Sequence, residues 1–581
     1  MKKIFCLAIS ALFMLSFPAK AQNSDPVLMT VGSENVTKSD FIKAYQKNST
    51  LSEASEADLR DYLRLYADYR MKVQEAKAMQ LDTAAVFQKE WESYKNQYAQ
   101  QYLIDTEVSD QLLDETTENS RYHIRASHIM VRLPQDASPK DTLAAYHKIM
   151  KIREEIVNGM NFNDAAERYS EDESARDHVN PQSQRLQRGN RGELGYFSVL
   201  EMIYPFEVAA YNTPVGQVSM PVRSQYGYHL IYVQDKVPAM AKLFVSQIFI
   251  KDSTALDSQK NHDEAMNKYA QIKRKFQQGT SFEELVREYS DDNATKANGG
   301  RMEPFSPNRR PGNYVHAALS IKDGGISEPI PSVIGWHILR LDSIVYTTVN
   351  DEFKYMIKNR LSRDSRSKKS KDALVEKLKV EYNYDESGKK AAMKFFKKNM
   401  PDGFFQTKQV AADQLKGIEK LKPMCTFADQ QITAVDFGKH LSRYQGVTLT
   451  TTMENFLENI FHAFSSDNIL RYESTQLMRK YPEYRDVVNE VYDGLMIYEV
   501  NSVKVWNAAI ADTVGTERFY EQIKTQFATG DSLNPYKPFA DVRAVVISQY
   551  QDKLEKEWLE ELHRKYPVKV DEDVFRSILK K

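Results

Sequence analysis

The chain is poor in cysteine and carries no excess charge of either sign. Only two of its 581 residues are cysteines, Cys6 and Cys425, and Cys6 lies in an N-terminal segment expected to be removed. An intramolecular disulfide is therefore excluded, and with it the small disulfide-stapled scaffolds. The 79 basic and 80 acidic residues leave a net charge of −1. This balance gives no electrostatic basis for binding nucleic acid or an anionic membrane surface.

Several motifs that define common enzyme classes are also missing. The sequence holds no nucleophile elbow, no HExxH, no paired CxxC and no P-loop. Its histidines lack the local spacing of a metal site, so neither a metal nor a cofactor is expected. An unrelated hydrolase is thus poorly supported. Beyond the N-terminus no apolar run approaches the roughly 20 residues that span a bilayer, and we expect no stable membrane insertion.

What remains is the composition of a large folded protein. The hydrophobic fraction is 41% and the charged fraction 27%, enough apolar material for packed cores. A chain of this length predicts about three to five domains.

The N-terminus has the three parts of a secretory signal. Lys2 and Lys3 precede an apolar run from Ile4 to Phe17, and Ala19-Lys20-Ala21 supplies small residues for cleavage before Gln22. We expect residues 1–21 to be a signal peptide and the mature protein to be periplasmic. A signal anchor is the alternative, but the apolar run is short for it.

Residues 126–233 and 245–341 carry the same landmarks in the same order. The first copy reads Ser127-His128-Ile129, Tyr169-Ser170-Glu171-Asp172, Gly192-Glu193-Leu194-Gly195-Tyr196-Phe197, Met202 to Phe206, and Gly227-Tyr228-His229-Leu230-Ile231. The second copy reads Ser246-Gln247-Ile248, Tyr289-Ser290-Asp291-Asp292, Gly299 to Phe305, and Gly335-Trp336-His337-Ile338-Leu339.

The spacing of these landmarks shows one unit used twice. Asp172 follows His128 by 44 residues and Asp292 follows Gln247 by 45, while 32 residues separate Phe197 from His229 and also Phe305 from His337. Only the middle differs, with 25 residues in the first copy and 13 in the second. Such a pattern is typical of a shared fold with one loop insertion.

Together these landmarks resemble a tandem pair of parvulin-type peptidyl-prolyl isomerase domains, and the whole chain resembles periplasmic folding factors of the SurA and PrsA type. The resemblance implies an α+β multidomain fold. Each parvulin-like domain would hold an antiparallel four-stranded sheet with surrounding helices, and mainly helical chaperone-like modules would flank the pair. The expected ranges are 1–21 for the signal peptide, 22–120 for an N-terminal helical domain, 121–238 and 240–345 for the two parvulin-like domains, and 346–581 for a C-terminal, mainly helical region that includes a second chaperone-like module.

Isomerisation of an X–Pro bond needs little chemical apparatus. Amide resonance holds the rotation barrier at roughly 18–20 kcal/mol. An enzyme lowers it by removing the bond from water, donating a hydrogen bond towards the prolyl nitrogen and binding the twisted form best. An apolar proline pocket and a small polar network are sufficient.

The first copy has residues for both at positions that match the family. The resemblance assigns a proline pocket to Leu194, Met202 and Phe206. It assigns a catalytic network to His128, Asp172, Ser224 and His229. Each assignment has a plainer alternative: the histidines as satisfied core residues, the three apolar side chains as core, and Asp172 as a helix cap, a role compatible with catalysis.

The segment Ala175 to Asn190 departs from the compact family loop. It contains Arg176, His178, Pro181, Arg185 and Arg188. A solvated loop is the first interpretation, and a role in substrate choice is the alternative.

The second copy departs from the family at two site positions. Gln247 replaces the first histidine and Arg310 falls where Met202 would be, whereas Asp292, Met302, Tyr314 and His337 are retained. A charged arginine in a proline pocket is unfavourable unless its head reaches solvent. We therefore expect this copy to keep the fold with weak or absent isomerase activity.

The flanks are predicted to be mainly helical. A hairpin over 27–36 and a helix capped by Thr37 and Asp40 precede one long helix over Leu59 to Ala76 and another over 84–113; a further helix is predicted over 350–380. The hairpin and capped helix recur at an offset of 396, where Thr433 and Asp436 stand. This recurrence is either a true repeat or a common local pattern.

The resulting hypothesis is a prolyl isomerase and chaperone for unfolded exported polypeptides, including outer-membrane proteins. Such chains contain slow prolines and unprotected strand edges. A groove lined by Tyr45, Tyr62, Tyr66, Tyr69 and Met71 is one candidate for holding them, with core packing as the alternative. The competing function is a non-catalytic holdase that uses parvulin folds as peptide-binding platforms.

Overall fold

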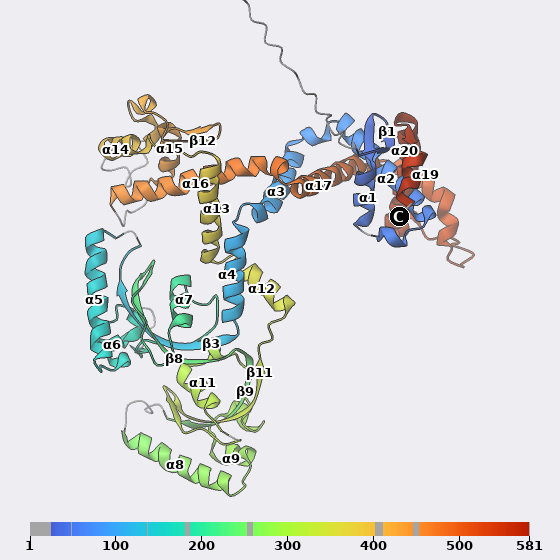
Figure 1. The fold of residues 1–581 in the computed structure, drawn as a ribbon. Helices are drawn as coiled ribbons and strands as arrows, with labels where there is room; N and C mark the ends of the chain where they lie inside the picture. The colour runs from blue at the N-terminus through green and yellow to red at the C-terminus, as the bar shows by residue number, and fades with distance from the viewer. Residues whose placement is uncertain are drawn as a thin grey trace, which may run out of the picture. The chain divides into compact units, whose positions relative to one another are not determined.

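The computed structural model describes residues 25–47, 49–135, 137–179, 186–252, 259–322, 324–400, 411–445 and 452–579 (Figure 1). The expected signal peptide lies outside them. One compact unit joins the described residues up to Gln100 with those from Gln476 onward, and the other comprises Gln101–Thr475. The linear domain ranges stay predictions. Within the described residues, each helix is too short or too polar to cross a membrane.

The first copy folds around a four-stranded antiparallel sheet, as expected. Its strands are β3 (Tyr122–Arg132), β6 (Glu193–Phe197), β7 (Val222–Ser224) and β8 (Gly227–Pro238), in the order β6-β3-β8-β7. Helices α5 (Pro139–Val157) and α6 (Phe162–Tyr169) cover one face and α7 (Tyr204–Asn212) covers the other (Figure 1).

Strand alternation decides what each face of this sheet carries. On β3, Ile129 and Val131 pack with α5 and α6, whereas Ile124 and Ala126 pack with α7. Because side chains on a strand alternate between faces, His128 continues the row that faces α7. The same alternation on β8 places His229 on that face. Both histidines thus lie on the side of the sheet that α7 covers.

The second copy has a reduced sheet. In the described residues it comprises β9 (Met240–Lys251), β10 (Ile330–Ser332) and β11 (Gly335–Tyr346), in the order β10-β11-β9. The expected fourth strand survives as isolated bridges from Leu243 to Phe305 and from Ser246 to Arg301. Pro304 interrupts this segment, since proline has no N–H for a strand ladder.

Helices cover the second sheet as they cover the first. Helix α8 (Gln259–Gln277) and α9 (Phe282–Tyr289) pack against Ile248 and Ile250 on one face. Helix α11 (Gly312–Leu319) packs against Leu243 and Val245 on the other. The short α10 (Asn293–Lys296) precedes the bridged segment.

The unit formed by the two ends of the chain is built on an N-terminal hairpin. Strands β1 (Val27–Val31) and β2 (Glu34–Thr37) lead into α1 (Lys38–Gln46), and Thr37 and Asp40 form the expected capping box. From the C-terminal end, β14 (Val568–Val570) pairs antiparallel with β1. Helices complete this unit: α2 (Glu56–Ala78), α3 (Ala85–Ala99), α17 (Pro482–Asn501), α18 (Asn507–Ala511), α19 (Thr513–Ile523), α20 (Phe539–Lys565) and α21 (Glu572–Leu579).

The recurrence at an offset of 396 is confirmed as a repeat of local structure. Strands β12 (Cys425–Phe427) and β13 (Gln430–Ile432) form a hairpin, and Thr433 and Asp436 form a capping box at the start of α15 (Ala434–Leu441). Phe41 and Phe437, which are equivalent, are both 0% exposed.

The equivalence extends to a third segment, from another part of the sequence, that pairs with each hairpin. Thr30 of β1 pairs with Lys569, and its counterpart Thr426 bridges Asp385. The hydroxyl of Tyr566, three residues before Lys569, donates to buried Glu75 at 2.8 Å.

The second hairpin repeats this contact. Tyr382, three residues before Asp385, donates to Glu473, which is 1% exposed. Each of the two composite modules therefore combines a hairpin, a long helix carrying a buried glutamate, and a recruited tyrosine segment. In the second module the long helix is α16 (Met453–Lys480), and the recruited segment lies between α13 (Lys368–Glu381) and α14 (Lys389–Asn399).

Two predictions of continuous helices were wrong. The helix expected over 84–113 is divided into α3 and α4 (Thr106–Asn119), because the Asp105 side chain accepts from the Val108 amide and starts a new helix. The helix expected over 350–380 is divided into α12 (Asp351–Leu361), a 3₁₀ turn over Ser365–Ser367 and α13. Here Asp364 accepts from the Arg366 amide at 2.9 Å.

We expect Thr433→Ala to loosen the second hairpin module locally. Thr433 Oγ1 accepts from the Asp436 amide at 3.2 Å, and loss of such a cap costs about 1 kcal/mol. Hydrogen–deuterium exchange should quicken in the first turn of α15. Thr426→Ala is the matched control, since this exposed β12 side chain caps nothing; equal exchange in both variants would refute the capping role.

Candidate active site

Two buried histidines lie at the centre of the first copy. His128 on β3 pairs with Ile231, and His229 on β8 pairs with Met130, so the two histidines are diagonal neighbours across adjacent strands. Their rings stack with centroids 5.9 Å apart and 14° between planes. His128 is 8% and His229 3% exposed. The fold thus brings together the two histidines that the sequence singled out.

Asp172 joins His128 in a charge-assisted contact. Its Oδ2 lies 3.0 Å from His128 Nε2, and its Oδ1 accepts from the Ser174 amide at 3.0 Å. The hydrogen bond from His128 is the main reason that the pKa of Asp172 lies far below its usual value. Asp172 is therefore ionised near neutral pH. Asp172 thus caps a turn and contacts His128 at the same time, so the capping role is compatible with membership of the network.

Ser224 holds the second histidine. Its hydroxyl lies 2.7 Å from His229 Nε2 and accepts from the Tyr226 amide at 3.1 Å. Because that hydroxyl already accepts a bond, its own proton is free to be donated to the ring nitrogen. Burial lowers the pKa of His229 to about 4. His229 is consequently a neutral imidazole at physiological pH.

The apolar residues assigned to the pocket gather beside the histidines. Phe206, 3% exposed, packs edge-on against His128 at 5.8 Å and against His229 at 5.6 Å between centroids. Half-buried Leu194 on β6 and Met202, in the loop before α7, pack in the same apolar cluster as Phe206. Phe206 therefore links the apolar side chains to the polar network.

One property of the first copy is unusual for a buried network. The Nδ1 atoms of both His128 and His229 are buried and make no hydrogen bond to the protein. Buried polar atoms in folded proteins are nearly always paired. Unpaired ring nitrogens beside an apolar cluster are the kind of feature that functional sites retain at the expense of stability.

The second copy closes the corresponding network. Gln247 Nε2 donates to Asp292 at 3.2 Å, and Gln247 Oε1 lies 3.0 Å from His337 Nδ1. His337 Nε2 lies 3.0 Å from the Ser332 hydroxyl. The Tyr314 hydroxyl also donates to Gln247 Oε1, at 3.4 Å. Replacing histidine by glutamine thus satisfies the ring nitrogen that stays unpaired in the first copy.

Arg310 occupies the pocket position of the second copy as the sequence suggested. The residue is exposed, and its guanidinium lies 5.2 Å from the centroid of the Phe305 ring. Its positive charge adds to burial in lowering the pKa of His337 to about 4. The arginine is thus solvent-exposed with its guanidinium beside an aromatic ring, which is how a charged side chain is tolerated at such a position.

The described part of the 175–190 insert makes contacts within itself and with α6. Arg176 Nε donates to the Glu167 carbonyl at 2.7 Å, and Arg188 pairs with Asp177 at 2.8 Å. His178 lies in a two-residue strand pair, whereas Pro181 and Arg185 lie outside the described residues. These contacts favour the solvated-loop interpretation.

Sequence reasoning missed two charged residues behind the pocket. Glu207, next to Phe206, and Arg366 form a bidentate ion pair that is 2% exposed at both partners. An acidic residue inside the apolar stretch Phe206 to Tyr211 was the available signal. The partner, Arg366, was not predicted because it lies within the helix expected over 350–380, where a basic residue is expected to be exposed to solvent.

The sheets, covering helices and paired sites define two domains of one type. Residues 128–235 and 248–343 match the PPIC-type PPIASE domain of the rotamase family, so the chain carries two such domains. Among the described residues no cluster of three or more His, Cys, Asp or Glu side chains is arranged to hold a metal ion.

Relatives with curated names match part of the chain. The chain is 26% identical over 260 residues to the chaperone SurA of Methylococcus capsulatus, covering 43% of this chain and 52% of that protein. It is 24% identical over 276 residues to the chaperone SurA of Nitrosococcus oceani, covering 46% and 61%. It is 35% identical over 139 residues to foldase protein PrsA 1 of Bacillus cereus, covering 24% and 39%. The chain thus spans between about two fifths and three fifths of these relatives.

We expect the histidines to make the protein acid-sensitive. An unfolded histidine has an ordinary pKa of 6.5, whereas folding lowers the pKa of His229 and of His337 to about 4. Between these values the unfolded chain binds more protons, so their contribution to stability is complete above 6.5 and is lost as pH falls towards 4. In a series of thermal unfolding midpoints, the double variant His229→Gln, His337→Gln should show a shallower fall over this range. An unchanged slope would contradict the assignment.

Proposed function

We propose that the protein is a peptidyl-prolyl cis-trans isomerase and chaperone for unfolded exported polypeptides. The observation that carries the isomerase part is the first copy's site, where two unpaired histidine nitrogens and an ionised aspartate lie beside the apolar cluster of Phe206. The names of the matched relatives, chaperone SurA and foldase PrsA, support the chaperone part. The signal-like N-terminus supports a periplasmic location, where outer-membrane proteins are candidate clients.

In this proposal the pocket residues act first. Leu194, Met202 and Phe206 enclose the proline ring and withdraw the X–Pro bond from water, which favours the less polar twisted amide over the planar one. A branched side chain, a deformable thioether and an aromatic ring suit a pyrrolidine. Binding energy from this contact is useful only if the twisted state fits better than either planar isomer.

The polar network then stabilises the twisted bond. When the prolyl nitrogen leaves conjugation its lone pair becomes a hydrogen-bond acceptor, and a donor fixed beforehand lowers the barrier. We assign this environment to His128, Asp172, Ser224 and His229. Asp172 fixes the ring of His128, Ser224 fixes that of His229, and the low pKa of His229 keeps its imidazole neutral. No covalent bond forms or breaks.

We further propose that the second copy contributes little catalysis. Its glutamine closes the polar network and its arginine covers the pocket position. Peptide binding or structural spacing is the better-supported role for this domain.

The composite modules are our proposed chaperone surfaces. In the terminal unit, Tyr62, Tyr66 and Tyr69 form a stacked, half-buried row on α2, with 9° between the planes of neighbouring rings. Met71 is 0% and Tyr45 7% exposed, so these two belong to the core. The three tyrosines are thus the part of the predicted groove that remains available to an extended chain. We propose the second composite module, residues 368–399 with 425–445 and 452–475, as the second chaperone-like module.

Exchanging one pocket residue between the copies tests the division of labour. In the full-length mature protein, we expect Met202→Arg to lower turnover of a proline tetrapeptide by about 100-fold, the upper range for a displaced binding group. Met202→Leu, which conserves volume, should retain most activity. Arg310→Met should leave turnover unchanged, because the first copy carries it. Full activity in Met202→Arg would contradict the proposal.

The non-catalytic holdase remains the competing function, and one pair of assays separates the two. We expect Asp172→Asn to reduce isomerase turnover, because a neutral amide no longer forms a charged contact with His128. Suppression of the aggregation of a denatured substrate should persist in the same variant. If refolding of a proline-limited substrate is also unimpaired, the isomerase activity is irrelevant to the chaperone and the holdase is favoured.

A further inference from the structure

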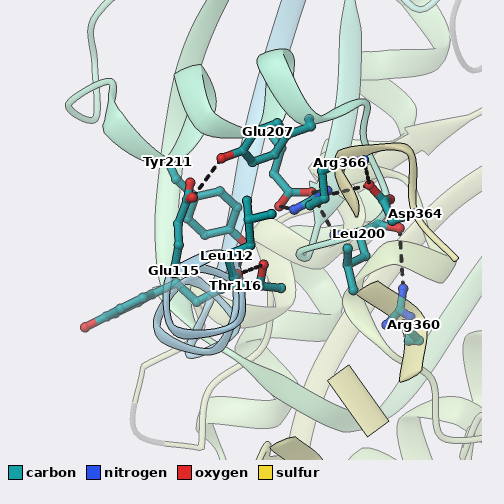
Figure 2. A network of polar contacts seen from close by, with 11 residues as sticks. Leu112, Glu115, Thr116, Leu200, Glu207, Tyr211, Arg360, Asp364 and Arg366 are labelled. Atoms are coloured by element: carbon teal, nitrogen blue, oxygen red, sulfur yellow. Dashed lines mark hydrogen bonds and ion pairs between the residues drawn. The ribbon is translucent and has the colours of Figure 1, made fainter. Parts of the chain in front are cut away.

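Glu207 and Arg366 form an ion pair that is almost completely buried behind the proline pocket. Arg366 Nη1 and Nη2 donate to Glu207 Oε1 and Oε2 at 2.7 and 3.0 Å (Figure 2). Glu207 lies on α7 directly after Phe206. Arg366 belongs to the 3₁₀ turn over Ser365–Ser367, beyond both matched domain ranges. A segment outside the parvulin-like domains therefore contacts the helix that carries the pocket phenylalanine.

The same carboxylate fixes the loop that carries Met202. Glu207 Oε2 accepts from the Leu200 amide at 2.7 Å. Leu200 has φ of 63°, in the left-handed region that non-glycine residues seldom adopt, and such a conformation persists only when its surroundings hold it. Arg360 of α12 donates to the Leu200 carbonyl at 3.4 Å (Figure 2). Two contacts thus hold Leu200, two residues before Met202.

Further contacts fix the arginine and the start of α7. Arg366 Nε donates to Asp364 at 2.8 Å, and its guanidinium lies 4.7 Å from the centroid of the Tyr204 ring. The Tyr204 hydroxyl donates to Glu115 on α4 at 2.8 Å. In addition, Ile357 of α12, 1% exposed, packs in the same apolar cluster as Phe206. The first turn of α7 is held on several sides by segments that the family domain does not contain.

Stability alone is a weak explanation for such a pair. Desolvation of two charges offsets most of their attraction, and apolar pairs of similar volume are often as stable. What a bidentate arginine–carboxylate contact does provide is a fixed relative geometry of the two segments. The second copy supports this distinction: the position equivalent to Glu207 is Val315, which is 0% exposed. The buried acid is present only in the copy with the intact site.

We propose that Arg366 is a positioning residue for the proline pocket of the first copy, acting through Glu207 to fix Phe206 on α7 and the Met202 loop. This inference rests on the isomerase function proposed above. It makes the 3₁₀ turn between α12 and α13 part of the catalytic apparatus, although the turn touches no substrate. It also means that the family domain cut at residue 238 lacks a component of its own pocket.

The test is steady-state kinetics of the full-length mature protein on a proline tetrapeptide, which is small enough to use the pocket alone. Arg366→Lys keeps the charge but loses the two-pronged contact. We expect kcat/KM to fall by about 10- to 100-fold, the range for a slightly misplaced binding group, with KM raised. Arg340→Lys is the matched control, because Arg340 likewise pairs with Glu283 at 2.9 Å, but in the second copy. It should leave the kinetics unchanged.

A double variant separates positioning from folding. Glu207→Leu with Arg366→Met removes both charges, so no unpaired ion is left buried. We expect this variant to have a thermal midpoint close to that of the parent while its kcat/KM remains reduced. Parent-like kcat/KM in the folded Arg366→Lys and double variants would overturn the inference and leave the isomerase proposal intact. A parent protein without turnover would overturn the isomerase proposal, and the positioning role with it.

Discussion

The antiparallel pairing of β3 with β8 is the constraint on which the site depends. Its register places His128 and His229 diagonally across adjacent strands and turns both towards α7. A slip of one residue in either strand would send that strand's histidine to the opposite face, against α5 and α6. The long ladder between these strands, with apolar side chains on both faces, holds the register. The polar network therefore forms because strand alternation turns His128 and His229 to the same face of the sheet. Each histidine stands in a row of otherwise apolar side chains.

The two copies share one fold but differ in whether the buried polar atoms at the site have hydrogen-bond partners. In the second copy both ring nitrogens of His337 have a partner, because Gln247 Oε1 accepts from Nδ1 and the Ser332 hydroxyl bonds to Nε2. Val315 replaces the buried acid, and Arg310 replaces the thioether of the pocket. On the proposal that only the first copy is catalytic, these are the substitutions expected at a site adjusted towards stability, since unpaired buried polar atoms are costly. The first copy retains that cost.

The two composite modules are assembled from segments that are distant in the sequence. Each combines a hairpin and a long helix with a tyrosine segment taken from a distant part of the sequence. In one module the recruited segment follows the hairpin in the chain, and in the other it precedes it. The unit formed by the two ends of the chain is accordingly a single packed body rather than two separate flanks.

Much of the first copy could be predicted from sequence, because its landmarks are local motifs at fixed spacing. The seven assigned residues lie on one side of one sheet, and the capping boxes at Thr37 and Thr433 are short-range patterns. The misses have two physical causes. Asp105 and Asp364 each cap a new helical segment within a longer amphipathic stretch. The spacing of apolar residues does not change at either break, so the sequence predicts one continuous helix. Arg366 and Glu207 are 159 residues apart, and a single sequence holds no signal that joins them.

The central claim is that the first copy binds proline for catalysis and the second does not. Methyl NMR of the intact mature protein tests it most directly, with Met202 and Met302 as reporters in the two pockets. Titration with a proline tetrapeptide should broaden the Met202 resonance through catalysed cis–trans exchange, whereas the Met302 resonance should show no such exchange, whether or not the second copy binds the peptide. Catalysed cis–trans exchange sensed equally at both methionines, or at Met302 alone, would contradict the account.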